Sequence, residues 1–133
     1  MSAVVDASLL VGALTRSDHE GVWCEAALER HVLAAPELAL AEATNILRRM
    51  EAFGSLSRPE AASAHRDMLR YKIARYPFAP FAGRVWELRA NLTAYDAWYV
   101  ALAEALDWPL LTLDRRLSRA TGPRCEVIVP PVG

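Results

Sequence analysis

Short apolar runs alternate along the chain with longer segments whose apolar positions repeat at helical spacing. The short runs predict β-strands at residues 4–5, 32–34, 73–76, 110–113 and 126–129. The longer segments predict helices near residues 9–14, 17–30, 36–53, 57–69, 80–92, 94–106 and 114–119. Strands that alternate with helices are typical of a parallel sheet covered on both faces. We therefore expect the α/β fold class, as a three-layer α/β/α architecture around a central, mainly parallel five-stranded sheet.

Local signals indicate where several helices begin and end. The segments Ser17–Glu20 and Ser57–Glu60 have the form of a capping box, in which the Ser caps the helix and the Glu reaches back to it. Pro36 suits the first turn of a helix, and Gly54 suits a helix end. These signals predict the starts of three helices and the end of one.

The segments 80–92 and 94–106 have the strongest helical patterns. In the first, apolar residues recur from Phe81 at i, i+4, i+7 and i+11, which predicts one amphipathic helix. The second is apolar nearly all round, and such a helix is usually packed inside the core. For the tryptophans of these segments, Trp86 and Trp98, we expect core packing rather than stacking on nucleic-acid bases.

Composition limits the kind of protein. The chain has 133 residues, 53% of them hydrophobic, so we expect a single domain over residues 1–133 with an ordinary core. No run of about 18 apolar residues and no leader-like N-terminus is present, so we expect a cytoplasmic protein with no membrane partner. The two cysteines, Cys24 and Cys125, lack the spacing of a zinc site. A formal net charge of −1 excludes a uniformly basic coat, although not a local basic patch.

Four carboxylates occur where a parallel sheet would bring them together. Asp6 follows the first predicted strand and Asp114 follows the fourth. Glu42 lies inside a predicted helix, and Asp96 lies in the first turn of another. In an open α/β sheet, ligands bind outside the C-terminal strand ends, which share one edge. We therefore expect the four acids to share one crevice.

Each acid also has a structural explanation of its own. Asp6 and Asp114 could cap the helices that follow them, and Glu42 could lie at the rim of an apolar helix face. Asp96 could complete a capping box opened by Thr93. Four like charges in one crevice, however, would raise one another's pKa unless a cation neutralised them.

The ligand set and the missing motifs narrow the chemistry. Oxygen ligands without His or Cys favour Mg²⁺, with Mn²⁺ as the alternative. A Mg²⁺ ion that retains water suits phosphodiester hydrolysis. The sequence has no Gly-x-Gly-x-x-Gly after the first strand, no Walker motif and no Gly-x-Ser-x-Gly elbow, so other common α/β enzymes fit poorly.

Four segments together resemble the PIN domain, in particular the VapC toxins of bacterial toxin–antitoxin pairs. They are Val4–Ser8, Glu42–Asn45, Tyr95–Ala103 and Leu110–Leu117. The Tyr-Asp-Ala-x-Tyr-x-Ala-x-Ala run and the Leu-Thr-x-Asp run are specific in combination. The resemblance extends over nearly the whole chain.

The resemblance implies a Mg²⁺-dependent endoribonuclease that hydrolyses RNA phosphodiester bonds as the toxin of a VapBC pair. It also implies a homodimer and inhibition by a cognate VapB-type antitoxin. Position by position, the residues that match the acidic quartet of the family are Asp6, Glu42, Asp96 and Asp114. The residues that match its polar support are Ser8, Asn45 and Thr112. Asp6 and Asp96 are expected to bind the metal directly, and the other two acids would complete the site through the ion or its waters.

Two alternatives stay open at this point. The chain could be a PIN nuclease of RNA processing outside a toxin pair, or a non-enzymatic α/β interaction module whose acids only cap helices. Four arginines near the predicted acids could hold phosphates or could lie on solvated helix faces; they are Arg48, Arg49, Arg115 and Arg116.

Overall fold

A computed structural model describes residues 1–132 of the chain. Its central sheet has five parallel strands in the order β3-β2-β1-β4-β5. The strands are β1 Ser2–Val5, β2 Val32–Pro36, β3 Ile73–Tyr76, β4 Leu110–Leu111 and β5 Val127–Ile128. The helices are α1 Ala7–Thr15, α2 His19–Arg30, α3 Ala39–Ala52, α4 Arg58–Met68, α5 Ala82–Glu87, α6 Ala94–Leu106 and α7 Arg115–Ser118, with a 3₁₀ turn η1 at Ala79–Phe81. The predicted three-layer α/β/α fold is confirmed.

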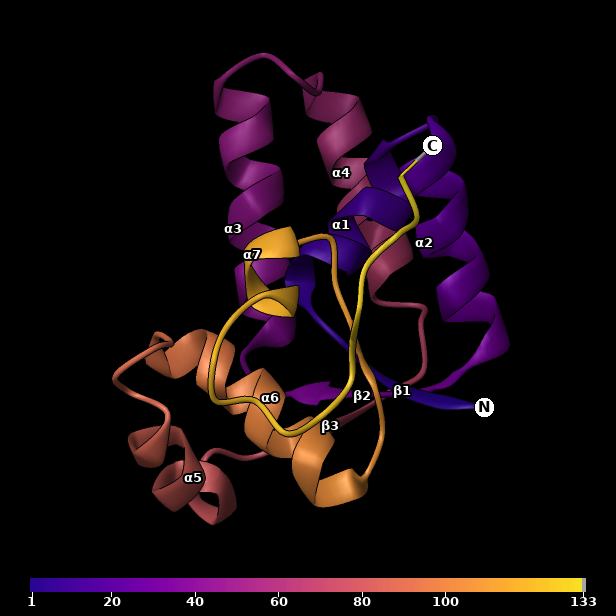
Figure 1. Ribbon diagram of the computed structural model, residues 1–133. Helices are drawn as coiled ribbons and strands as arrows, with labels where there is room; N and C mark the ends of the chain where they lie inside the picture. The colour runs from indigo at the N-terminus through magenta and orange to yellow at the C-terminus, as the bar shows by residue number, and fades with distance from the viewer. Residues whose placement is uncertain (133) are drawn as a thin grey trace.

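Helices cover both faces of the sheet, as Figure 1 shows with α1 to α4 above it and α5 and α6 below. Strand β1 explains this arrangement, because its successive side chains point to opposite faces. Ala3 and Val5 pack with α1 and α2, whereas Val4 packs with α6. All three are fully buried, which agrees with the place of β1 in the sheet: it is the first strand in the sequence and the central strand in space. None of the helices within residues 1–132 combines the length and the apolar character that a membrane span requires.

Helix α6 has the predicted bounds and the predicted burial. The Thr93 hydroxyl caps it by accepting a hydrogen bond from the backbone N–H of Asp96 at 3.2 Å. Every residue from Ala97 to Ala103 is buried, since the sheet covers one side of the helix and α5 covers another. The helix ends at Asp107, whose left-handed backbone (φ 56°) turns the chain toward β4.

Two predicted helix starts are wrong, whereas the capping box at Ser57 is confirmed. Helix α2 is capped by Asp18 and not by Ser17, because the Asp18 carboxylate accepts the Gly21 N–H at 3.1 Å and is held by an ion pair with Arg16. Pro36 is the last residue of β2 rather than the first turn of a helix. A proline is tolerated at a strand end, where its missing N–H interrupts little of the ladder.

The predicted helix at 80–92 is also wrong in extent. The apolar stripe does pack on the core beneath α6, but the chain follows the 3₁₀ turn with the six-residue helix α5 and then turns at Leu88 to reach the start of α6. The core packing expected for Trp86 is wrong as well, because this short helix buries one face only. Trp86 is 66% exposed, and the centre of its ring lies 4.2 Å from the guanidinium carbon of Arg89, whereas Trp98 is buried as expected.

The strands predicted at 110–113 and 126–129 are each shortened to two residues. The Thr112 N–H still donates to Ile128 at 3.1 Å. Beyond it, the Thr112 hydroxyl binds side chains of the crevice described below, and the chain leaves the sheet.

Candidate functional site

The structure brings the four predicted acids to one cavity at the C-terminal edge of the sheet. Asp6 follows β1 and Asp114 follows the adjacent parallel strand β4, so both leave the sheet at the same edge. Glu42 reaches this edge from the first turn of α3, and Asp96 from the first turn of α6. The cavity has a volume of about 410 Å³ and is lined by Asp6, Ala7, Ser8, Glu42, Asn45, Ile46, Arg49, Asp96, Tyr99, Asp114 and Arg116.

Asp6 is the most firmly held of the acids. One carboxylate oxygen accepts the Ser8 hydroxyl at 2.7 Å and the Leu9 N–H at 3.1 Å, and the other accepts the Thr112 hydroxyl at 2.6 Å. A carboxylate offers about four lone-pair positions. These three donors therefore leave about one position, on the oxygen that Thr112 contacts, for a further ligand.

Burial raises the pKa of Asp6 from 3.8 to about 6. The hydrogen bonds from Thr112, Ser8 and Leu9 lower this pKa, and the charge of Asp96 raises it slightly. A carboxylate that is expensive to ionise in an apolar setting gains most when a cation is placed beside it.

Glu42 is held by Tyr99 from α6. The Tyr99 hydroxyl donates to one Glu42 oxygen at 2.7 Å. Burial raises the pKa of Glu42, the Tyr99 bond lowers it, and the charge of Asp96 raises it. The second Glu42 oxygen accepts no hydrogen bond from residues 1–132 that meets ordinary geometry, so this side chain also has ligand capacity.

Asp96 and Asp114 differ in their electrostatic setting. Burial, followed by the charge of Asp114, raises the pKa of Asp96. The pKa of Asp114 is lowered instead, mainly because the Arg116 guanidinium binds its carboxylate with contacts of 2.8 and 3.2 Å. Asp114 also caps α7 by accepting the Arg116 N–H at 3.0 Å.

The three predicted supporting residues have different positions. Ser8 and Thr112 contact Asp6 directly, and Thr112 also accepts the Asp114 N–H at 3.0 Å, which links two of the acids. Asn45 lines the cavity, but its side-chain oxygen accepts a hydrogen bond from Arg48 at 3.0 Å, and within residues 1–132 its side chain makes no hydrogen bond to any of the four acids.

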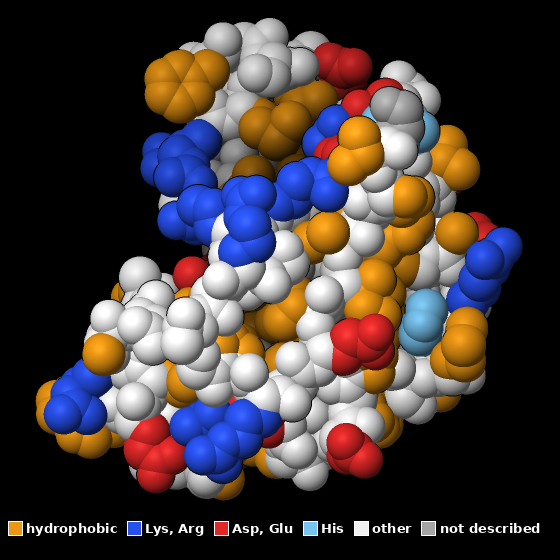
Figure 2. Space-filling model, viewed as in Figure 1, with side chains coloured by type: hydrophobic (Ala, Val, Ile, Leu, Met, Phe, Trp, Pro, Cys, Tyr) orange, Lys and Arg blue, Asp and Glu red, His pale blue; other side chains and the backbone are white. Residues whose placement is uncertain are grey.

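The four candidate arginines differ in whether they line the cavity. Arg49 and Arg116 line the cavity. Arg115 is fixed by Glu20 at 2.9 Å and by the Pro130 carbonyl at 3.0 Å, so its role is structural. Figure 2 shows Lys and Arg side chains gathered in a band over the α3 and α7 side of the molecule, next to a notch in its surface. This local basic band is compatible with a net charge near zero.

The lining fits a divalent cation in charge and in donor type. Four carboxylates and two guanidinium groups line the cavity, which leaves a formal balance of two negative charges (four minus two). The available donors are carboxylate, hydroxyl and amide oxygens, the set that Mg²⁺ and Mn²⁺ prefer. Within residues 1–132, no three Asp, Glu, His or Cys side chains already stand in a metal-binding arrangement. Asp6, Glu42 and Asp114 are instead each bound by protein donors, so small side-chain movements would be needed to close such a site.

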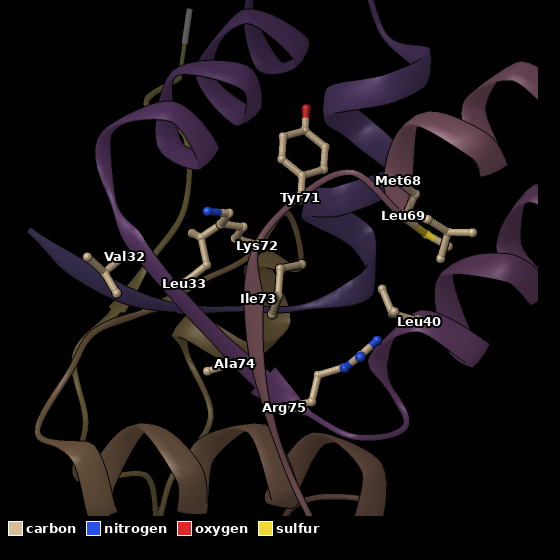
Figure 3. A pocket seen from close by; sticks show the side chains of 10 residues that line it. All are labelled: Val32, Leu33, Leu40, Met68, Leu69, Tyr71, Lys72, Ile73, Ala74 and Arg75. Atoms are coloured by element: carbon tan, nitrogen blue, oxygen red, sulfur yellow. The ribbon is translucent and has the colours of Figure 1, made fainter.

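A second hollow lies along the edge strand β3, as Figure 3 shows. It has a volume of about 510 Å³ and is lined by Val32, Leu33, Leu40, Met68, Leu69, Tyr71, Lys72, Ile73, Ala74 and Arg75. This lining contains apolar, aromatic and basic side chains and no carboxylate. It therefore offers no carboxylate ligands for a cation, and the acidic cavity is the candidate site.

Sequence reasoning missed the role of one residue of the cavity and the partner of another. Tyr99 was counted only as part of a family motif, although its hydroxyl holds Glu42. Arg116 was a possible phosphate contact, whereas the structure pairs it with Asp114. The only available signal was helical spacing, which places Asp96 and Tyr99 three residues apart on one face of α6.

Replacing Tyr99 by Phe should weaken Mn²⁺ binding about two- to tenfold. The change removes the hydroxyl that holds Glu42, which raises the pKa of that carboxyl further and frees its rotamers. Calorimetric titration with Mn²⁺ at pH 7 measures the effect. Tyr95→Phe is the matched control, because Tyr95 is 57% exposed on the same helix and lies outside the cavity lining. Equal Mn²⁺ affinities of the two variants would show that the Tyr99 hydroxyl does not support metal binding.

Comparisons with known proteins agree with this geometry. The PIN domain family matches residues 3–123. Ribonuclease VapC1 of Mycobacterium tuberculosis is 43% identical over 126 residues, which cover 93% of this chain and 94% of that protein. Ribonuclease VapC9 of the same species is 41% identical over 128 residues, which cover 96% of this chain and 98% of that protein.

A solved structure supports the fold. A chain of VapBC2 from Rickettsia felis, crystallised with a DNA fragment from the promoter of the pair, superposes with a TM-score of 0.69 at 17% identity. The match covers 97% of this chain and 98% of that one. The family match over most of the chain, together with the identity to VapC1 and VapC9, shows that this chain belongs to the PIN domain family, as a VapC-type member.

Proposed function

We propose that the chain is a metal-dependent endoribonuclease that hydrolyses RNA phosphodiester bonds as the toxin of a VapBC pair. The observation that carries the proposal is the convergence of Asp6, Glu42, Asp96 and Asp114 on one cavity at the C-terminal edge of the sheet. Ribonuclease VapC1, at 43% identity, supports RNA as the substrate class. In a non-enzymatic interaction module, nothing would offset the cost of placing four carboxylates, three of them with raised pKa values, in one cavity.

Asp6 and Asp96 are the proposed direct ligands of a Mg²⁺ or Mn²⁺ ion, and Glu42 and Asp114 would complete the site. When bound, the ion would lower the pKa of a water and stabilise charge on a phosphoryl oxygen. Ser8 and Thr112 orient the Asp6 carboxylate, and Tyr99 orients Glu42. These hydrogen bonds limit the rotamers of Asp6 and Glu42, which reduces the cost of ordering both acids when RNA and metal arrive.

A VapB-type antitoxin is the proposed partner, as the VapBC2 complex suggests by analogy. The homodimer that the family resemblance implies, and a single domain over residues 1–133, stay predictions. So does the cytoplasm as the site of action.

The direct test is RNA cleavage by the purified chain, with RNA ends sequenced after brief exposure. Cleavage in Mg²⁺ that stops in EDTA is expected, with the Asp96→Asn protein as control. Expression should arrest growth, and co-expression of a small reading frame immediately upstream should relieve the arrest. Cleavage without growth arrest or upstream partner would favour a PIN nuclease of RNA processing. No cleavage and no metal binding at millimolar Mg²⁺ would contradict the proposal in favour of an interaction module.

A further inference from the structure

Arg116 and Asp114 form a two-point ion pair inside the cavity lining. Nη2 of Arg116 lies 2.8 Å from one Asp114 oxygen, and Nε lies 3.2 Å from the other. The Arg116 backbone N–H adds a third contact at 3.0 Å. Three of the roughly four lone-pair positions of the carboxylate are thereby occupied by one residue.

The pairing conflicts with the role proposed for Asp114. A guanidinium and a divalent cation bind the same carboxylate oxygens, so Arg116 and the cation compete for Asp114. The Arg116 side chain is 80% exposed, and an exposed ion pair is weak. Displacing it would lower metal affinity only about two- to fivefold.

A released Arg116 would remain beside the reacting centre. It is the second residue of α7, two positions after the capping residue Asp114, and it lines the same cavity. A guanidinium binds phosphate oxygens in the same two-point geometry as it binds a carboxylate. The neighbouring Arg115 is fixed by Glu20 and Pro130 and has no such freedom.

We propose that Arg116 holds Asp114 in the metal-free protein and exchanges this carboxylate for a phosphate of the RNA when a divalent cation binds. The inference rests on the proposed function, because it needs both the cation and the RNA. It makes Arg116 a phosphate-binding residue of the cavity that also competes with the metal, and the two roles predict opposite effects of the same substitution.

The first arm of the test measures Mn²⁺ binding by calorimetry without RNA. Arg116→Met, which keeps chain length and removes the guanidinium, should bind Mn²⁺ about two- to fivefold more tightly than the unmodified chain. Arg119→Met is the matched control, since Arg119 lies at the end of the same helix and its side chain makes no hydrogen bond or ion pair within residues 1–132. The control should stay within about 1.5-fold, because the exposed charge is screened. If the Mn²⁺ affinity of Arg116→Met is lower than that of the unmodified chain, or equal to that of Arg119→Met, Arg116 does not compete with the metal.

The second arm measures single-turnover RNA cleavage at saturating Mn²⁺. Arg116→Met should cleave about tenfold or more slowly, and the salt dependence of its RNA affinity should lose about 0.7 of a logarithmic slope unit. Arg116→Lys keeps the charge but not the two-point geometry, so it should keep the salt slope and recover part of the rate. Arg119→Met should cleave at the unmodified rate. An Arg116→Met rate equal to that of the control overturns the phosphate role.

The two levels of failure are distinguishable. If the unmodified chain binds no Mn²⁺ or cleaves no RNA, the proposed function fails. If it does both and Arg116→Met behaves as Arg119→Met, only the exchange fails. Circular dichroism and urea unfolding of both variants show whether the substitutions have left the overall fold intact.

Discussion

Replacing Asp6 by Asn should lower RNA cleavage by about 10³-fold or more and, in the same protein, raise the stability of the metal-free fold at pH 7. The loss of activity follows because an amide cannot supply the negative charge of a ligand that the cavity presents with about one open lone-pair position. The gain in stability follows because ionised Asp6 is unfavourable in its buried setting.

The size of the stability gain comes from the pKa of Asp6. Its value of about 6 in the fold, against 3.8 ordinarily, sets an upper limit of about 3 kcal/mol on the cost of ionisation at pH 7. Asn keeps most of the network: its oxygen can accept from Ser8 and Leu9, and its amide can donate to the Thr112 hydroxyl. A gain of about 1–3 kcal/mol is therefore expected in urea unfolding with EDTA.

Asp18→Asn is the matched control, because Asp18 is also an N-cap aspartate. Arg16 lowers the pKa of Asp18 to about 2, so its ionised form is favoured and the substitution should lower stability at pH 7. Cleavage should be unchanged, because Asp18 is not among the residues that line the cavity. Asp6→Asn that keeps its activity, or that loses stability as Asp18→Asn does, would show that Asp6 is only a helix cap.

Mn²⁺ affinity should fall at least about tenfold between pH 7 and pH 5. A carboxylate must lose its proton to bind the ion, and Asp6, with a pKa of about 6, is mostly ionised at pH 7 and mostly protonated at pH 5. Asp6 alone gives the tenfold change, and the raised pKa values of Glu42 and Asp96 would steepen it. Calorimetry across this range measures the slope. Affinity that stays constant down to pH 5 would contradict the account.

The contribution of Asp6 to the stability of the metal-free protein should change with pH in the opposite direction to the Mn²⁺ affinity, because it should fall as the pH rises. The folded pKa of Asp6 is raised, so the folded state holds this proton more tightly than the unfolded chain does. Its contribution to stability is therefore greatest below pH 4 and is lost as pH rises to about 6. Groups with lowered pKa values, such as Asp114, act in the reverse sense, so the comparison is made as the difference between Asp6→Asn and the unmodified chain. The difference in stability between the two proteins should be small near pH 4, grow as the pH rises and become constant above about pH 6.

The sheet and the acids could be predicted from sequence because they depend on local patterns and on one topological rule. Asp6 and Asp114 each follow an apolar strand, and parallel strands end at the same edge. The bounds of α6 follow from Thr93 and from an apolar run that stops before Pro109. These features need no knowledge of which distant side chains meet.

The errors occurred where a long-range contact competes with a local rule. Ser17 satisfies a capping pattern, but Glu20 pairs with Arg16 and with the distant Arg115 instead of reaching back. Asp18 then takes the cap. The segment 80–92 satisfies a helical stripe, but the chain must turn within it to place Thr93 at the head of α6.

The hydrogen-bond partners of the acids could not all be predicted from the sequence either, because two of these contacts are also long-range. The contact between Glu42 and Tyr99 joins residues 57 positions apart, and that between Asp6 and Thr112 joins residues 106 apart. Arg116 is near Asp114 in the chain, yet nothing in the sequence pattern indicates that its guanidinium binds that carboxylate. These partners determine which acids are held and which can bind a further ligand.

The most direct measurement is the anomalous scattering of Mn²⁺ in crystals of the chain grown near pH 7. The account predicts an ion in the acidic cavity, with carboxylate oxygens of both Asp6 and Asp96 within about 2.0–2.5 Å of it. An ion bound at any other place, or no ion in the cavity at millimolar Mn²⁺, would contradict the claim that these acids form a metal-dependent nuclease site.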